Sequence, residues 1–302
     1  MMFTRRTAIA STLAAAAAGL APAKVLADAA PATVLQLRRR NIEVNGKAAS
    51  VYEIAQPDGT LGIDTRVGDR FRVRVENQIA EPSLIHWHGL APPWRQDGVP
   101  GISGPPIPPG GSADYDFPLR FGGAFWMHSH QGFQEQLLMS APLIIRDDRD
   151  EADQQEVVLM LRDFSFTPPE EIYAALTKPK TMGGMGAKAP GMAMQPKPGA
   201  QAAPDLNDVA YDAFLANDRT LADPEIVRVD PGARVLLRAI NGSSMSNFHL
   251  DLGALNGELI AVDGFRVKPM TARRFPLAVA QRLDIRITIP RGPAAYPVLA
   301  IL

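Results

Sequence analysis

Two histidine doublets constrain this chain more than any other feature of its sequence. Four of its five histidines lie in the segments His86-Trp87-His88 and His128-Ser129-His130. Residues i and i+2 of a β-strand project from the same face, so each doublet is expected to present two imidazoles together. Four imidazoles from two strands suit a copper or zinc site. The alternative is a set of packed or solvent-facing histidines, since a single doublet can occur on a surface strand by chance.

The chain contains no cysteine, which limits what a metal centre here could do. This absence excludes disulfides, iron–sulfur clusters, thiolate zinc sites and cysteine nucleophiles. It also excludes a blue copper centre, which requires a thiolate ligand. The 302 residues leave room for two domains, and 46% hydrophobic with 21% charged residues is typical of a globular protein. A formal net charge of −1 gives no indication that nucleic acid or an anionic membrane surface is a partner.

Residues 1–29 are predicted to be an export signal. The pair Arg5-Arg6 precedes an apolar, alanine-rich run over residues 8–20, and Ala27-Asp28-Ala29 offers a small-residue cleavage site. The run is too short to span a membrane comfortably, and the paired arginines favour the twin-arginine export machinery. A bacterial periplasmic location follows from this prediction. The alternative is an uncleaved amphipathic tail.

The remainder of the chain is predicted to be rich in β-strands. Apolar and charged residues alternate over residues 70–76, which is the period of a half-buried strand. Further strands of this kind are predicted over residues 235–240, 259–262 and 283–289. In the last of these, Asp284, Arg286 and Thr288 are expected to face solvent. One short helix is expected over residues 169–176. Many short strands separated by glycine-containing turns indicate β-sandwiches.

A charged stretch over residues 147–153 is interpreted as the linker between two sandwiches. It predicts a first domain at 30–148 and a second at 149–302. The opening strands of these domains share a weak pattern, in which a glycine turn starts an alternating strand that ends in Asn77 or Asn241. This pattern suggests two copies of one fold.

Four blocks, in the order of the chain, closely resemble the first domain of multicopper oxidases. They are residues 84–90 (LIHWHGL), 96–101 (QDGVPG), 106–112 (PIPPGGS) and 123–130 (GAFWMHSH). A weaker similarity, at Asn241-Gly242 and residues 261–264, extends to the second domain of the family. The resemblance implies an all-β protein made of tandem cupredoxin-like Greek-key β-sandwiches.

The resemblance also implies a role for each ligand. Family members oxidise substrates at a blue copper and reduce O₂ to water at a trinuclear copper cluster. His86 matches a ligand of the type 2 copper, and His130 matches a ligand of one type 3 copper. His88 and His128 match ligands of the other type 3 copper. Asp97 matches an acid near the cluster that helps to move protons, although a simple Asp-Gly turn is an equally good interpretation.

The chain departs from the family pattern in two ways. Met127 stands where a tyrosine is usual, which is tolerable because its side chain is expected to point away from the metal face. No segment supplies the remaining cluster histidines or the blue-copper cysteine of the family's third domain, and His249 stands alone in the second domain. Half of the ligands of the trinuclear cluster are therefore expected here. Together with the apolar final run 297–302, this suggests a truncated sequence from which the third domain is absent.

Four methionines cluster in a low-complexity segment, about residues 178–204, which is expected to be a loop. They are Met182, Met185, Met192 and Met194. Thioethers suit Cu(I). In the family that the chain resembles, periplasmic oxidases that defend against copper often carry such methionine-rich inserts. A Cu(I) contact is one interpretation, and a linker with incidental methionines is the other.

These features together predict the N-terminal part of a periplasmic multicopper oxidase. The whole enzyme would couple one-electron oxidation of phenols or metal ions to the reduction of O₂ to water. The chain alone is expected to be inactive. The alternatives are a non-catalytic copper-binding protein of copper tolerance and a cupredoxin-like scaffold for protein contacts. The intact histidine doublets argue against the scaffold.

Overall fold

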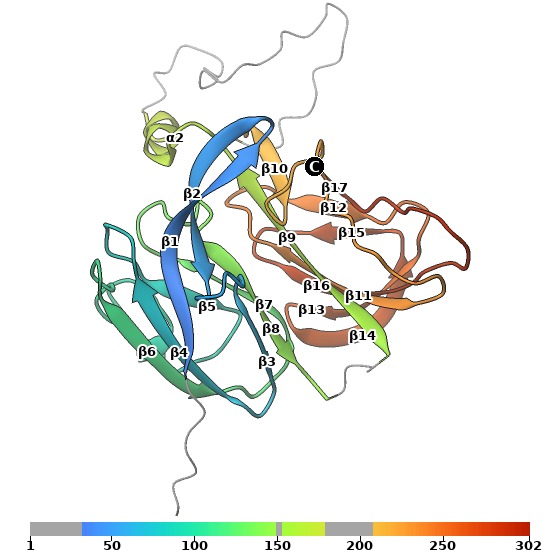
Figure 1. Ribbon diagram of the computed structural model, residues 1–302, viewed down its shortest axis with the longest axis horizontal. Helices are drawn as coiled ribbons and strands as arrows, with labels where there is room; N and C mark the ends of the chain where they lie inside the picture. The colour runs from blue at the N-terminus through green and yellow to red at the C-terminus, as the bar shows by residue number, and fades with distance from the viewer. Residues whose placement is uncertain (1–31, 149–152, 179–207) are drawn as a thin grey trace, which may run out of the picture. The chain divides into compact units, whose positions relative to one another are not determined.

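The computed structural model describes residues 32–148, 153–178 and 208–302, whose regular structure is mainly β-strand (Figure 1). The predicted export signal and the four clustered methionines lie outside the described residues. None of the helices in the described part of the chain is long and apolar enough to cross a membrane. The sheets fall into two groups, one built from residues before 147 and the other from residues after 153.

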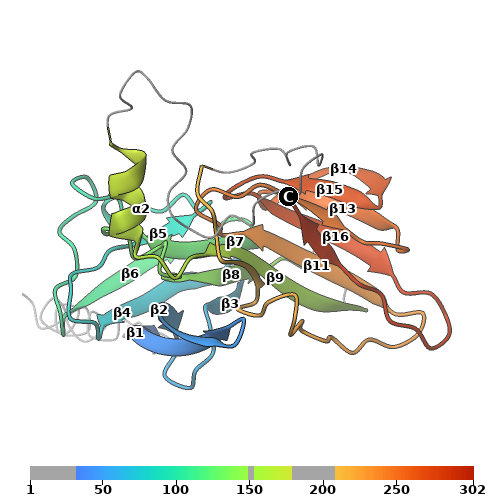
Figure 2. The ribbon, with the colours of Figure 1, turned by 90° about the horizontal axis from the view of Figure 1, so that it is seen from above.

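The first sandwich pairs two four-stranded sheets (Figure 2). One sheet has the order β2 (Lys47–Ala55), β1 (Thr33–Val44), β4 (Arg70–Asn77) and β6 (Ser112–Pro118). The other has the order β3 (Ile63–Arg66), β8 (Ser140–Arg146), β7 (Gly123–Ser129) and β5 (Ile85–His88). Apolar side chains from both sheets form one core that includes Phe71, Trp87 and Phe125. The alternation predicted over residues 70–76 is confirmed, because every second residue of β4 is buried.

The second sandwich contains a six-stranded and a three-stranded sheet. The larger has the order β10 (Ala213–Ala216), β9 (Gln154–Phe164), β11 (Arg234–Asn241), β16 (Arg282–Thr288), β13 (Gly257–Val262) and β14 (Phe265–Ala272). The smaller has the order β15 (Arg274–Leu277), β12 (Phe248–Asp251) and β17 (Leu299–Ile301). The three predicted strands correspond to β11, β13 and β16. The predicted helix is α2 (Pro169–Leu176), with prolines at its start as expected.

The prediction that the polar residues of β16 face solvent is largely wrong. Asp284 is buried, and its carboxylate accepts a hydrogen bond of 2.8 Å from Arg238 Nη1. Arg286 is half-buried and pairs with Glu258, and only Thr288 is exposed. The physical reason is that Asp284 lies at the junction with the first sandwich, where Gly122 and Gly123 line the same small cavity. The polar face of β16 is therefore covered near Asp284 and becomes exposed toward Thr288.

Asn77 and Asn241 make the same hydrogen bonds at equivalent places. Asn77 ends β4, and Asn241 ends β11. In each, Oδ1 accepts a hydrogen bond of 3.1 Å from the backbone N–H two residues further on. In each, Nδ2 donates to a carbonyl four or five residues further on and to a second carbonyl 30 or 36 residues away. This match supports the interpretation of the two sandwiches as copies of one fold.

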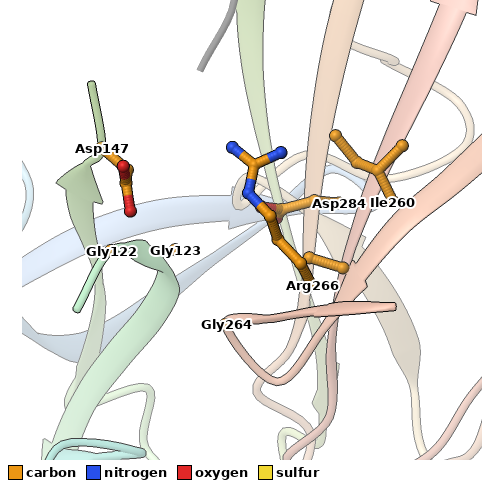
Figure 3. Close-up of a pocket in the computed structure, with 8 residues that line it drawn as sticks. Gly122, Gly123, Asp147, Ile260, Gly264, Arg266 and Asp284 are labelled. Atoms are coloured by element: carbon orange, nitrogen blue, oxygen red, sulfur yellow. The ribbon is translucent and has the colours of Figure 1, made fainter. Parts of the chain in front are cut away.

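Glycines lie where the two sandwiches touch. Gly123, at the start of β7, has φ +144°, and a Cβ there would lie 2.5 Å from the Cα of Gly264. A cavity of about 20 Å³ lies beside these glycines, and Asp147 from one sandwich and Arg266 from the other are among its lining residues (Figure 3). The backbones approach so closely that a side chain at Gly123 would push them apart.

Candidate metal centre

The pairing of β5 with β7 brings the two histidine doublets together. These strands are antiparallel neighbours, and their register places His86 opposite His128. The ring of His86 lies 5.6 Å from that of His88, 5.5 Å from that of His128 and 4.7 Å from that of His130, measured between centroids. The sequence prediction that each doublet presents its imidazoles on one face is confirmed. Trp87 lies on the opposite face, fully buried in the core.

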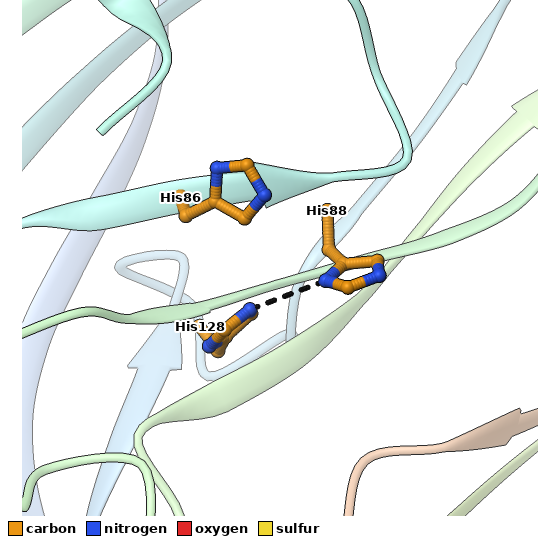
Figure 4. Close-up of side chains that lie close together, drawn as sticks. All are labelled: His86, His88 and His128. Carbon is orange, nitrogen blue, oxygen red and sulfur yellow. Dashed lines mark hydrogen bonds between the residues drawn. The ribbon is translucent and has the colours of Figure 1, made fainter. Parts of the chain in front are cut away.

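Three of the histidines form a compact set of possible ligands (Figure 4). One ring nitrogen from each of His86, His88 and His128 can be chosen so that all three lie within 4.8 Å of one another. His88 Nδ1 and His128 Nε2 face each other at 3.3 Å. His130 lies beside this set, with its ring stacked on that of His86, but it is not one of the three. The four predicted ligands therefore lie together without all sharing one point.

Asp97 fixes the orientation of His86. The backbone oxygen of Asp97 lies 2.7 Å from His86 Nδ1, and the Asp97 carboxylate lies 3.4 Å from the same nitrogen. His86 Nδ1 therefore donates to this carbonyl, which leaves Nε2 free as a ligand atom. Gly98 makes this contact possible, because its φ is +73° and a Cβ there would lie 1.9 Å from the Ile85 oxygen. Asp97 thus lies at the site, as predicted, and its closest contact with His86 is through its main chain.

The turn after the second doublet holds His128 and its neighbour Ser129. Glu135 Oε2 lies 3.2 Å from His128 Nδ1, although without the alignment of a hydrogen bond. Gln134 is buried, and its Oε1 accepts hydrogen bonds of 2.7 Å from both Ser83 and Ser129. These contacts tie the turn to β7 and to the segment just before β5. Gln134 and Glu135 could not be predicted from the sequence, because residues in an irregular turn have no periodicity that would reveal their partners.

Burial keeps three of the candidate ligands, His86, His88 and His130, in the neutral form that binds metals. Desolvation lowers the pKa of His86 and of His130 below the ordinary value, and it lowers the pKa of His88 to about 3. The indole of Trp126 covers the site from one side, stacked at 4.2 Å on the ring of His128 and at 4.9 Å on that of His88. Water is therefore excluded on this side of the rings. No proton needs to leave His86, His88 or His130 at neutral pH before a metal binds.

The donor set fits copper or zinc. Imidazole nitrogens suit both metals, and the second ring nitrogen of His86 has a hydrogen-bond partner that orients the ring, as is usual for metal-binding histidines. Met127 is buried in the core on the other face of β7, as expected. His249 lies exposed on β12 in the second sandwich. The fold and the site together define a protein of tandem β-sandwiches with a candidate metal centre.

Comparison with known proteins identifies the family. Residues 37–150 and residues 155–301 each match a multicopper oxidase domain. The chain is 32% identical over 281 residues to the copper resistance protein A homolog of Pseudomonas syringae pv. tomato, covering 86% of this chain and 47% of that protein. It is 32% identical over 262 residues to copper resistance protein A of Escherichia coli, covering 77% and 42% respectively. The chain belongs to the multicopper oxidase family, and it spans about half the length of these relatives.

Solved structures with the same fold are more distant in sequence. The multi-copper oxidase of Pseudomonas thermotolerans has a TM-score of 0.71 and 23% identity, covering 89% of this chain and 60% of that chain. Fet3p, a multicopper oxidase that functions in iron import, has a TM-score of 0.69 and 20% identity, covering 88% and 47%. These likenesses confirm the predicted all-β fold of cupredoxin type. Family membership implies copper as the metal.

Proposed function

We propose that this chain forms the first two sandwiches of an exported copper oxidase, and that its doublets supply half of the ligands of a trinuclear copper cluster. The observation that carries the proposal is the register of β5 and β7, which places His86 opposite His128. In this assignment His86 serves the type 2 copper, His88 and His128 serve one type 3 copper, and His130 serves the other. His130 stacks on His86 but is not one of the three histidines whose ring nitrogens lie within 4.8 Å of one another. This position supports an assignment in which His130 binds a different ion from its neighbours.

Copper bound at the doublets would supply the redox chemistry by which O₂ is reduced to water. The protein's own residues orient the imidazoles and exclude water from one side of them. Asp97 is placed to hold or deliver a proton, because its carboxylate lies 3.4 Å from His86 Nδ1 and is about one third exposed. The substrates would be phenols or metal ions, oxidised one electron at a time. The site that accepts their electrons needs a thiolate, which this sequence does not contain.

Two features of the sequence outside the described residues complete the proposal. Residues 1–29 would direct export to the periplasm by the twin-arginine machinery, which suits a protein similar to copper resistance protein A. The four clustered methionines would bind Cu(I), and substitution of all four by leucine should then weaken Cu(I) binding without affecting Cu(II) at the doublets.

The proposal is tested by copper binding to residues 30–302. We expect the purified segment to bind Cu(II), and His86→Ala and His128→Ala each to weaken this binding by about tenfold or more. His249→Ala is the matched control and should bind like the wild type. Stoichiometry is measured by metal analysis and affinity by competition with a chelator. Binding that survives the loss of His86 and His128 together would overturn the assignment.

An oxidase assay tests the ligand count directly. With copper added, this segment should oxidise no phenol and show no intense blue absorption, because the thiolate ligand is lacking. Turnover or a blue colour from this segment would contradict the ligand count.

A further inference from the structure

Arg282 carries a charged group from the second sandwich into the first. It begins β16, and its side chain is only 5% exposed. Its Nη1 and Nη2 donate to the carbonyls of Ala280 and Asp263, at 3.0 and 3.1 Å, within the second sandwich. Its Nε donates to the carbonyl of Ala124 on β7, in the first sandwich, at 3.2 Å. The planar guanidinium therefore joins the two sandwiches by three directed hydrogen bonds.

The far end of the guanidinium lies against the turn that follows the first histidine doublet. A Cβ at Gly89 would lie 2.2 Å from Arg282 Nη2, so the turn has room for the guanidinium only because residue 89 has no side chain. The guanidinium carbon also lies 5.6 Å from the ring centre of Phe125 on β7. Arg282 thus lies against Gly89, which follows His88, and against Ala124 and Phe125, which precede Trp126 on β7.

This arrangement is specific to an arginine. Burial of a guanidinium is costly unless its donors have partners, and burial here lowers the pKa of Arg282, opposed by the charges of Asp263 and Asp284. The three carbonyls require donors in fixed directions, which a planar fork supplies and an ammonium does not. The fixed positive charge also contributes, after burial, to the lowered pKa of His88.

We propose that Arg282 is a positioning residue for the copper centre, which holds the Gly89 turn and β7 so that His88 Nδ1 faces His128 Nε2. This inference rests on the proposed function, because it assigns Arg282 a role toward the metal that the doublets would bind. Through Arg282 the second sandwich would help to shape the metal centre, although the described part of that sandwich contributes no ligand to the set of three. The role is one of geometry, so charge alone should not replace it.

The test compares Arg282→Lys and Arg282→Met with Arg274→Met in residues 30–302. Arg274 is the matched control, because it lies in the same sandwich but forms an exposed ion pair with Asp251. We expect both Arg282 variants to bind Cu(II) about tenfold or more weakly and Arg274→Met to match the wild type. Circular dichroism checks folding. Gly89→Ala, which displaces the guanidinium from the other side, should weaken copper binding in the same direction.

A second readout needs no metal. In the apoprotein, the imidazole NMR signals of His88 should shift in both Arg282 variants and stay unchanged in Arg274→Met. Wild-type copper affinity or unshifted His88 signals in Arg282→Lys would overturn the proposal. The charge or the size of residue 282 would then be enough to hold His88 in place. If the wild type binds no copper, the proposed function fails, and the His88 signals still decide the role of Arg282. If Arg282→Met does not fold, Arg282→Lys and Gly89→Ala carry the test.

Discussion

At the scale of single residues, the metal centre depends on how each imidazole is held. His86 is oriented by the main-chain oxygen of Asp97, and His128 lies beside the carboxylate of Glu135. Both neighbours lie on the Nδ1 side, so each of these two rings has Nε2 to offer to a metal. His88 is the exception, because its Nδ1 faces His128. The ring orientations are thus set by neighbours that are not ligands, and a change in a neighbour should alter metal binding.

Gly98 provides a sharp test at this scale. Gly98→Ala should destabilise the chain by about 2–4 kcal/mol, because the new Cβ would lie 1.9 Å from the Ile85 oxygen. It should also weaken copper binding, since the Asp97 carbonyl would move away from His86. The measurements are urea unfolding and Cu(II) affinity.

Gly101 offers a closely matched control for this substitution. It lies in the same loop with φ +72°, against +73° at Gly98, but a Cβ there meets nothing within 4 Å. Gly101→Ala should cost only the backbone strain, about 1 kcal/mol, and leave copper affinity unchanged. Equal effects of the two substitutions would mean that the close approach of Gly98 to β5 is unimportant.

The cluster of candidate ligands could be predicted from the sequence, but most of the residues that surround it could not. His86 and His88 lie on one face because residues two apart in a strand must do so. Glu135 and Arg282 act on the site from an irregular turn and from a strand more than 150 residues away. Neither position has a local signal, since only the tertiary structure brings it near a histidine. Asp97 is an intermediate case, because the resemblance located it but not the role of its carbonyl.

At the scale of elements, each sandwich closes a strand end with a buried asparagine. Asn77 and Asn241 are both almost fully buried, and each makes one accepted and two donated hydrogen bonds. A side chain that satisfies three backbone groups fixes the loop that follows it. In the first sandwich this loop leads directly into β5, which carries His86 and His88.

Removal of either asparagine should loosen only its own sandwich. Asn77→Ala and Asn241→Ala should each destabilise the chain by about 2–3 kcal/mol, because buried backbone groups lose their partners. Hydrogen exchange should speed up at the Ile79 amide in Asn77→Ala and at the Ser243 amide in Asn241→Ala. Faster exchange at both amides in both variants would show that the two strand ends are not independent.

The strand predictions were reliable where one face of a strand meets a core and the other meets water. β4 has this environment, and its alternating pattern was interpreted correctly. β16 has the same pattern, yet Asp284 is buried because its face of the sheet meets the first sandwich there. Asp284 is paired with the buried Arg238. In the sequence alone, an aspartate at such an alternating position cannot be told from one that faces solvent. The difference lies in packing between sandwiches, which the periodicity of one strand cannot indicate.

At the scale of the whole molecule, the buried histidines make stability depend on pH. The pKa of His88 is about 3 in the folded chain, against an ordinary value of 6.5. Between these pH values the unfolded chain binds a proton that the folded chain does not. Stability rises with pH wherever the unfolded state binds more protons. The apoprotein should therefore lose stability as the pH falls from 6.5 toward 3, and this contribution is complete above 6.5.

His88→Asn isolates this contribution. The urea midpoint of the metal-free chain is compared at about pH 7 and about pH 4.5. The wild type should lose more stability between these values than His88→Asn does, because the variant has no imidazole to protonate on unfolding. His249→Asn, a change at an exposed position on β12, should behave like the wild type. An equal loss in His88→Asn and the wild type would contradict the burial argument.

Because Trp126 stacks on His88 and His128, its fluorescence should respond to metal binding at the candidate centre. The chain has three tryptophans, and only Trp126 forms ring contacts with the candidate ligands among the described residues. Trp94 is 57% exposed, so its emission lies in water and responds to soluble quenchers, whereas Trp87 and Trp126 are shielded. A paramagnetic ion a few ångströms from the Trp126 indole would extinguish its fluorescence and leave that of Trp94 bright. Filling of the centre can therefore be followed by light alone, without a label.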